Sequence, residues 1–471
     1  MEYDLLIKGG RVIDPHNNID EVTDIALVKD KVASVGKNLN HDLSRLVISA
    51  DNLLVIPGVV DSHAHVARPN SKGAGFRMLV KAGVTTAVDF EGPIEVINRE
   101  ISLYSCGLNI AVLEGIKPGN GFSGINAPHH VIVEKTNRAL DDGAIGIKLL
   151  GGHYPLSPDT TADLIDTAAS EKAYVAFHVG TTETGSNILG LEEAIKLANG
   201  NPLHIAHVNA YCRGLIEDPI QEIYRAMQAL SQAGNVVSES HLAPFNGCSG
   251  FIGTDGLPES HVTRRCLETY GYSVDQKGIE QAILDGYAGV YALMGDEMQL
   301  LWEKDAREKW LEEDTRVGLS FSVNNRVSAL VSANHKNRNG AFTVEAISSD
   351  GGAIPRNFIL NYGMLLVKFG ALSLNELIKK TSYNPAQLFG FVNKGHLSPG
   401  ADADIALVDA NTGEAKTTII GGKVAMAGGI PIAGAGRVLT TERGAPYLNS
   451  KQVPHEIIDL EQSTYFKNNK S

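Results

Sequence analysis

Residues 57–66 read PGVVDSHAHV, and the pattern of the chain changes at this segment. Short β-rich runs precede it, whereas apolar runs alternating with longer helical patterns follow it. Strands that alternate with helices of about 10 to 15 residues are typical of parallel βαβ units. One strand-like run ends in this segment and seven others follow it along the chain. Eight strands are the number that closes a (β/α)8 barrel. The other seven runs are residues 84–90, 109–115, 144–150, 173–179, 203–209, 235–240 and 345–350.

Both ends of the chain carry a different, all-β pattern. The first run, YDLLIKGGRVID, has two β-rich halves around Gly9 and Gly10, which predicts a hairpin. A similar pattern returns near Ala401 in ADIALVDA and KTTIIGGKVAMAGG. We therefore predict an α/β protein in which residues 1–58 and 386–435 pair into one small β-sandwich beside a catalytic barrel of residues 59–385. The polar residues 436–471 lack periodicity and are expected to form a C-terminal tail, either a surface arm or partly disordered.

The composition excludes several classes of partner. The 471 residues are 43% hydrophobic and 20% charged, as in ordinary globular proteins. The formal net charge of -13 argues against nucleic acid and against acidic membrane surfaces, because both attract clustered Lys and Arg. We see no signal peptide and no long apolar run, and the four cysteines lie far apart. A cytoplasmic protein with a small-molecule substrate is expected.

His63 and His65 form an H-x-H pair at the end of the first barrel strand. Residues two apart on a strand face the same side, so both imidazoles can bind one metal ion. In a chain with 15 histidines, such a pair alone fits two surface loop histidines equally well. Asp61 is a candidate for orienting one of the rings.

Further residues of metal-binding type stand at the C-terminal ends of later strand-like runs. In a (β/α)8 barrel, that end of every strand faces the active site. One such residue would more often be packed or snorkelling, but several at successive strand ends predict a shared metal site. His204 competes with His207; three residues apart, they face opposite sides of a strand, so His204 would face the helices or be buried with a hydrogen bond. The candidates are Lys148, His178, His207 and Asp350.

Together these segments resemble the amidohydrolase superfamily, in its dihydroorotase and hydantoinase (cyclic amidohydrolase) branch. The resemblance extends over almost the whole chain. It implies a (β/α)8 TIM barrel flanked by a β-sandwich, a homo-oligomer, and two divalent metal ions, usually Zn²⁺, at the barrel mouth. The matching pieces are PGVVDSHAHV, GVTTAVDF, Lys148, FHVG, HIAHVN, SSDGG and NPAQLFGFVNKGHLSPGADADIALVD.

The resemblance also implies a role for each candidate residue. His63 and His65 would bind the buried ion, and His178 and His207 the more exposed one. Lys148, carboxylated by carbon dioxide, would bridge both ions, and Asp350 would bind the first ion and transfer a proton. The implied reaction is attack of a metal-bridging hydroxide on a C–N bond of a cyclic amide or an N-acyl compound.

The sequence departs from this branch where loops shape the substrate site. Asp350 is followed by GGAIP instead of a His-Ala-Pro-like segment, His178 by VGTTETG, and Lys148 by LLGG. Candidate substrate contacts are polar residues just past strand ends, each of which also fits a solvated rim. They are Arg68, His153, Tyr154, Asn209, Glu239 and His241.

Three other functions remain open. An esterase or lactonase would use the same hydroxide. Deaminases of nitrogen heterocycles in this superfamily commonly use one metal and do not need the lysine, so Lys148 counts against that function. A non-catalytic scaffold would have lost ligands, whereas every ligand position is filled here.

Overall fold

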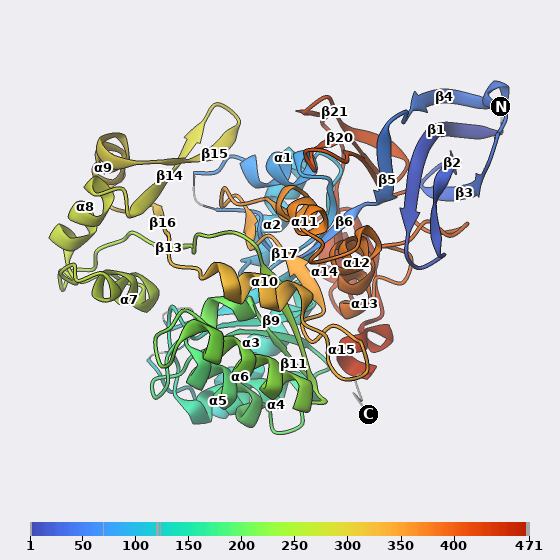
Figure 1. Ribbon diagram of the computed structural model, residues 1–471. Coiled ribbons are helices and arrows are strands. Elements are labelled where there is room, and N and C mark those ends of the chain that lie inside the picture. Colours follow the sequence, from blue (N-terminus) through green and yellow to red (C-terminus); the bar gives the residue numbers. More distant parts are fainter. Residues whose placement is uncertain (1, 69, 119–121, 123, 468–471) are drawn as a thin grey trace.

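The computed structural model describes residues 2–68, 70–118, 122 and 124–467. Parallel strands at its centre are hydrogen-bonded in the order in which they follow along the chain (Figure 1). The sheet closes, because β18 (Gly351–Gly352) comes directly after the last of these strands and pairs in parallel with the first. The predicted (β/α)8 barrel is therefore confirmed. Its strands are β6 (Val59–His65), β7 (Val84–Asp89), β8 (Asn109–Ile116), β9 (Gly146–Leu150), β10 (Tyr174–His178), β11 (Leu203–Ile205), β12 (Val236–His241) and β17 (Ala346–Ser348).

Helices cover the outside of the barrel, and alternation along the strands divides the side chains between two layers. In β9, Ile147 and Leu149 pack outward into the apolar layer beneath the helices, whereas Lys148 lies over the ring of Phe90 inside the barrel. The covering helices are α1 (Ala74–Lys81), α2 (Ile94–Tyr104), α3 (His129–Asp141), α4 (Pro158–Ser170), α5 (Ile188–Ala198), α6 (Pro219–Gln232), α10 (Arg326–Asn334) and α11 (Ile359–Lys368). The shorter segments α12 (Leu374–Ile378), η3 (Lys379–Tyr383) and α13 (Asn384–Leu388) follow.

The two ends of the chain form one nine-stranded sheet beside the barrel, at the upper right of Figure 1. β19 pairs antiparallel with β5 and so joins the two halves. The predicted β-unit built from both ends is confirmed, but the predicted hairpin at Gly9 is wrong. Gly9, with φ 75°, forms a bulge inside a continuous strand, and the chain reverses only after Asp14. The strands are β1 (Tyr3–Asp14), β2 (Ile19–Val28), β3 (Lys31–Gly36), β4 (Ser44–Ser49), β5 (Leu53–Pro57), β19 (Ile405–Asp409), β20 (Ala415–Ile420), β21 (Lys423–Ala427) and β22 (Ile430–Pro431).

The described part of the C-terminal tail is not a free arm. It contains β23 (Arg437–Thr440), which pairs in parallel with β8, followed by α14 (Ala445–Ser450), β24 (His455–Ile457) and α15 (Thr464–Lys467). Tyr465 is buried, its ring stacks on Tyr174 at 3.9 Å, and its hydroxyl accepts a hydrogen bond from Val175 N at 2.9 Å. These contacts attach the tail to the barrel opposite the strand ends that carry the site. The exact domain boundaries stay a prediction.

An insertion between β12 and β17 forms a separate small sheet, at the left of Figure 1. Tyr291 and Met298 of this insertion pack with Ala353 and Ile354, which follow the last barrel strand, so the insertion borders the barrel mouth. Its elements are β13 (Cys248–Ser249), α7 (His261–Thr269), α8 (Gln276–Leu284), β14 (Ala288–Met294), β15 (Glu297–Leu301), α9 (Glu303–Glu312) and β16 (Gly318–Phe321).

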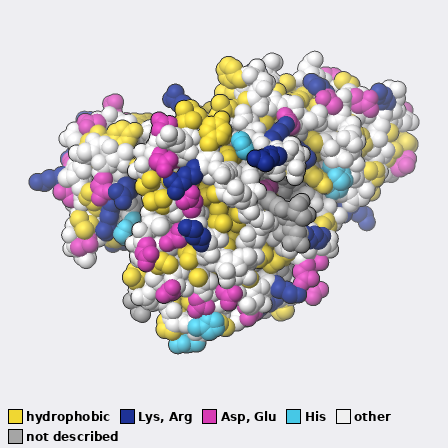
Figure 2. Space-filling model, turned by 60° about the horizontal axis from the view of Figure 1, so that its bottom comes forward, with side chains coloured by type: hydrophobic (Ala, Val, Ile, Leu, Met, Phe, Trp, Pro, Cys, Tyr) yellow, Lys and Arg dark blue, Asp and Glu magenta, His cyan; other side chains and the backbone are white. Residues whose placement is uncertain are grey.

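The surface fits the charge pattern of the sequence. On the face shown in Figure 2, basic and acidic side chains are interspersed, with no continuous basic stripe among the described residues. In the described part of the chain, no helix combines the length and the apolar character that crossing a membrane requires.

Candidate active site

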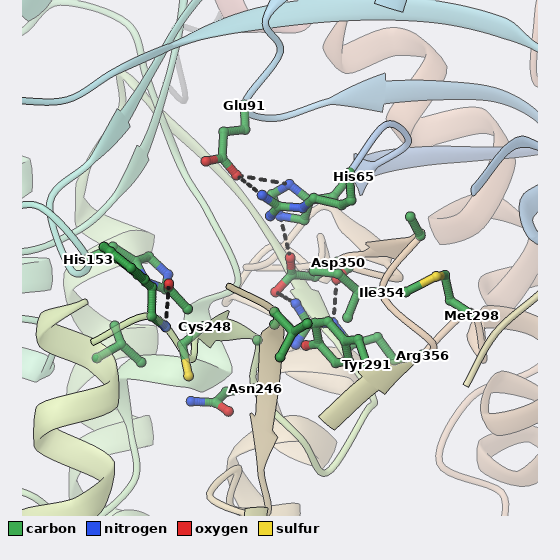
Figure 3. Close-up of a pocket in the computed structure, with 18 of the residues that line it drawn as sticks. His65, Glu91, His153, Asn246, Cys248, Tyr291, Met298, Asp350, Ile354 and Arg356 are labelled. Carbon is green, nitrogen blue, oxygen red and sulfur yellow. Dashed lines mark hydrogen bonds and ion pairs between the residues drawn. The ribbon is translucent and has the colours of Figure 1, made fainter. Parts of the chain in front are cut away.

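A cavity of about 730 Å³ opens at the C-terminal ends of the barrel strands, where its lining residues converge (Figure 3). All six residues predicted as metal ligands line it, although they come from β6, β9, β10, the segment after β11 and the segment after β17. Tertiary structure thus brings these residues of five chain segments to one place. They are His63, His65, Lys148, His178, His207 and Asp350.

His63, His65 and Asp350 form the tightest group. Asp350 Oδ1 lies 3.3 Å from His63 Nε2 and 3.1 Å from His65 Nε2. One potential ligand atom from each residue lies within 4.8 Å of the other two. Asp350 has a left-handed backbone conformation, with φ 48°, and its N–H donates to His63 O at 2.9 Å. Two imidazoles and a carboxylate with this spacing fit a divalent cation such as zinc.

A buried carboxylate beneath the cavity orients His63. Glu239 Oε1 lies 2.8 Å from His63 Nδ1 and accepts a hydrogen bond from His207 N at 2.6 Å. Ser348 Oγ donates to the other carboxylate oxygen. His63 Nε2 is thereby left facing Asp350 and the cavity. This is how a supporting carboxylate fixes the tautomer and direction of a metal-binding histidine.

Lys148 carries a buried amine that forms no ion pair within 4.0 Å in the described part of the chain. Its side chain is 1% exposed, and Nζ has no hydrogen-bond partner among the described residues. Nζ lies 4.6 Å above the ring of Phe90. Burial lowers the pKa of Lys148 to about 7, which makes a substantial neutral fraction of the amine available near neutral pH.

His178 and His207 form the second half of the predicted ligand set. Their ring centroids lie 4.4 Å apart, and His207 Nδ1 has no hydrogen-bond partner among the described residues. His178 Nε2 lies 3.0 Å from Ser186 Oγ. Gly152 makes room for His178, because a Cβ atom at this position would lie 2.1 Å from His178 Nε2.

His204 does not compete for the site and is buried with a hydrogen bond, as one of the two predicted alternatives had it, but the argument from strand alternation was wrong. β11 ends at Ile205, and His207 adopts a left-handed conformation with φ 32°, so strand alternation does not extend to it. Both histidines therefore point into the barrel, at different depths. His204 is fully buried against Phe90, with Nδ1 2.7 Å from Tyr174 Oη.

Burial and charge keep these groups in the forms that bind cations. Burial lowers the pKa of His63, His178 and His207 well below the usual value, so the imidazoles are neutral. Burial raises the pKa of Asp350, but Arg356 and the neighbouring histidines together hold that pKa well below its usual range. Neutral imidazole and ionised carboxylate are the forms that coordinate metal ions.

Comparisons with known proteins agree with this geometry. A model described as the amidohydrolase family matches residues 310–425. A dihydroorotase of Elusimicrobium minutum is 23% identical over 447 residues, which cover 87% of this chain and 89% of that protein. The chain thus matches the amidohydrolase family over residues 310–425 and is similar to dihydroorotases over most of its length. The predicted resemblance to the dihydroorotase and hydantoinase branch is thereby confirmed.

Solved structures of amidohydrolases support the fold. The N-acyl-D-glutamate deacylase of Bordetella bronchiseptica, complexed with zinc and a phosphonate inhibitor, gives a TM-score of 0.68 at 16% identity, with 93% of this chain and 99% of that chain covered. A D-hydantoinase gives a TM-score of 0.59 at 18% identity, with 92% and 98% covered. The TM-scores establish the shared barrel fold, but at identities this low the similarity does not identify the substrate.

Four of the six predicted substrate contacts line the cavity. His241 Nε2 lies 3.8 Å from Asp350 Oδ2. His153 Nδ1 lies 3.0 Å from Ser260 Oγ, and Tyr154 Oη donates to Glu259 at 3.3 Å. The four residues are Arg68, His153, Tyr154 and His241.

The other two predicted contacts lie beneath the cavity. Glu239 is inside β12, fully buried, and binds His63 rather than facing the substrate space. Asn209 is also fully buried and accepts a hydrogen bond from His241 N at 3.1 Å. Their prediction as substrate contacts was wrong, because both side chains support residues of the neighbouring strands. Asp61 likewise supports the backbone: it accepts from Ser349 N at 3.0 Å and so ties the first strand to the last.

Sequence reasoning missed several residues of the cavity. Arg356 binds Asp350 Oδ2 through Nη2 at 2.6 Å, and Glu91 binds Arg68 at 2.6 Å (Figure 3 labels Arg356, Asp350 and Glu91). Burial raises the pKa of Glu91, but Arg68, His65 and Lys117 bring it down to about 2. Glu91 comes just after β7, so the expectation that residues at strand C-termini face the active site could have identified it. The same expectation does not point to Arg356.

Proposed function

We propose that this chain is a metal-dependent amidohydrolase that cleaves a C–N bond of a cyclic amide or an N-acyl compound. The observation that carries the proposal is the buried, unpartnered Lys148 amine in the same cavity as His63, His65 and Asp350. Burying a lysine amine without a partner lowers the stability of the fold, so a purely structural role does not explain it. The names of the relatives, a dihydroorotase, a D-hydantoinase and an N-acyl-D-glutamate deacylase, support the class of substrate.

The donor set fits two divalent cations, which we propose to be zinc. His63, His65 and Asp350 would hold one, and His178 and His207 the other. The neutral Lys148 amine would attack carbon dioxide, form a C–N bond and release one proton, giving an anionic carbamate between the two positions. When bound, the ions would lower the pKa of a water molecule toward neutrality and polarise the substrate carbonyl.

The protein side chains would then manage the proton and the geometry. Asp350 would accept the proton of the attacking water and pass it to the leaving nitrogen. Arg356, 2.6 Å from Oδ2, holds the carboxylate so that Oδ1 faces His63 and His65. Glu239 keeps the His63 ring in place from below.

Metal analysis tests the proposal directly. The active protein is expected to contain about two equivalents of divalent metal by elemental analysis, and chelation should abolish turnover until the metal is restored. The substrate panel should contain cyclic ureides, N-acyl amino acids and esters. The exposed-histidine variant His129→Gln serves as control and should keep the wild-type metal content. Turnover that survives complete removal of metal would contradict the proposal.

Replacing Glu239 by Gln should weaken metal binding by roughly 10- to 100-fold, because the neutral amide no longer supports His63 Nδ1–H. A competition titration with a chromophoric chelator measures this effect. Glu114→Gln is the matched control: Glu114 is also a largely buried barrel carboxylate, but it accepts from Ile94 N at 2.8 Å and does not line the cavity. Equal metal affinity in Glu239→Gln and wild type would refute the supporting role.

We also propose that the protein is a homo-oligomer in the cytoplasm, as the family resemblance implies. Light scattering coupled to size exclusion measures the first property. A monomer at micromolar concentration would contradict it.

A further inference from the structure

The arginines that line the cavity differ in their partners. Arg68 is paired with Glu91 at 2.6 Å, Arg356 with Asp350 at 2.6 Å, and Arg316 with Asp314 at 3.9 Å. Arg213 has no carboxylate partner within ion-pair distance among residues 2–68, 70–118, 122 and 124–467. Its Nε and Nη2 instead donate to Asn324 Oδ1, at 3.1 and 2.7 Å.

Asn324 orients this guanidinium group rigidly. Its Nδ2 donates to Ala243 O at 3.1 Å and to Phe245 O at 2.7 Å, so its Oδ1 is fixed toward Arg213. The Nε–Nη2 edge of Arg213 is thereby satisfied. The second edge, Nη1–Nη2, is left for another acceptor, and such an edge matches the two oxygens of a carboxylate.

Arg213 stands between two cavities. It lines the cavity described above and also a neighbouring groove of about 550 Å³, which we call the side groove. The side groove lies between the loop of residues 181–187, which follows His178, and α7 of the insertion. Of the other charged residues there, Arg265 pairs with Glu268 at 2.9 Å, Arg264 Nε donates to Pro258 O at 2.6 Å, and Glu183 is exposed to solvent.

An arginine without a counter-charge is unfavourable where water is partly excluded. Burial lowers the pKa of Arg213, and the nearby Arg356 opposes its charge further. A bound anion would offset both effects. Arg213 lines the side groove together with residues 181–187, whereas Asp350 lines only the main cavity, so an anion in the side groove would lie on the side of the loop that follows His178.

We propose that Arg213 binds a carboxylate of the substrate at the junction of the cavity and the side groove. This inference rests on the proposed function and narrows it: the substrate is a cyclic amide or N-acyl compound with a carboxylate on the part remote from the scissile bond. The side groove has room for the substituent that carries the carboxylate.

The test compares matched substrates that differ only in charge: N-acetyl amino acids and carboxylate-bearing cyclic ureides, each against its primary carboxamide. In the metal-loaded wild type, kcat/KM should favour the carboxylate by roughly 10- to 100-fold. Arg213→Ala should remove this preference, mainly through KM, and added guanidinium should restore part of it. Asn324→Asp should also reduce the preference, because it sets a carboxylate against Arg213 without removing the arginine.

Arg316→Ala is the matched control, an arginine of the same cavity that should leave the preference unchanged. Circular dichroism and metal content show whether each variant is folded. Two results would overturn the inference and leave the proposed function standing. In the first, the wild-type protein hydrolyses both members of each pair equally well; in the second, Arg213→Ala keeps the preference for the carboxylate. If the loaded protein turns over no amide at all, the proposed function fails; calorimetry with the same pairs then decides whether Arg213 binds carboxylates.

Discussion

Asp350→Asn should lower kcat by roughly 10²- to 10⁴-fold. Asp350 is the only residue of the tight group that combines a place beside His63 and His65 with the ability to carry a proton. Asparagine keeps the shape of the side chain but can neither accept nor deliver that proton. It also leaves Arg356 buried without its carboxylate partner, which should cost further stability.

Steady-state kinetics and metal analysis on the same preparation separate the two consequences. Loss of kcat with metal retained supports proton transfer, whereas loss of both shows that Asp350 acts mainly as a ligand. Glu313→Gln is the matched control, since Glu313 lines the same cavity but pairs with Lys309 at 2.5 Å. Unchanged turnover in Asp350→Asn would exclude the proposed proton-transfer role.

Lys148→Ala should reduce metal content from about two equivalents to about one and lower kcat by at least about 100-fold. The physical reason is the loss of the one amine in the cavity that is buried, partly neutral and without a hydrogen-bond partner among the described residues. A small carboxylate such as propionate should restore part of the metal binding by taking the place of the carbamate. The substitution Lys148→Arg should not preserve binding of the second metal ion, because a guanidinium group remains cationic.

A second buried lysine makes the control informative. Burial also lowers the pKa of Lys380 to about 7, but its Nζ donates to Val344 O at 2.7 Å and lies outside the cavity. Lys380→Met should therefore alter stability and leave metal content unchanged. Full activity of Lys148→Ala with a single ion would contradict the two-metal proposal.

The candidate metal ligands were predictable because their directions follow from strand periodicity and from where each strand ends. Strand periodicity places Lys148 inward between Ile147 and Leu149, and the strand end decides that His178 faces the cavity. The same rule failed where the backbone leaves the strand conformation. His207 itself has a left-handed conformation, so alternation does not set its direction, and Gly9 forms a bulge where two adjacent glycines suggested a turn.

The supporting residues could not be assigned in this way, because their roles depend on partners far along the chain. Glu239 was predicted at the rim, but it lies inside β12 and is hydrogen-bonded to His63, 176 residues away. The C-terminal tail has no periodicity of its own, yet Tyr465 is buried against Tyr174. The orientation of such supporting side chains is fixed only when helices and strands from distant parts of the chain pack together.

The sequence by itself determined the barrel, the pairing of the chain ends and the identity of the candidate metal site, since all three depend on hydrophobic period and on which residue ends a strand. Only the tertiary structure decided which charges are neutralised. Arg68 and Arg356 find carboxylates of the chain, whereas Arg213 finds an amide oxygen of Asn324. Charge pairing acts through space over a few ångströms, so the difference between Arg213 and the paired arginines of the cavity becomes visible only in the folded chain.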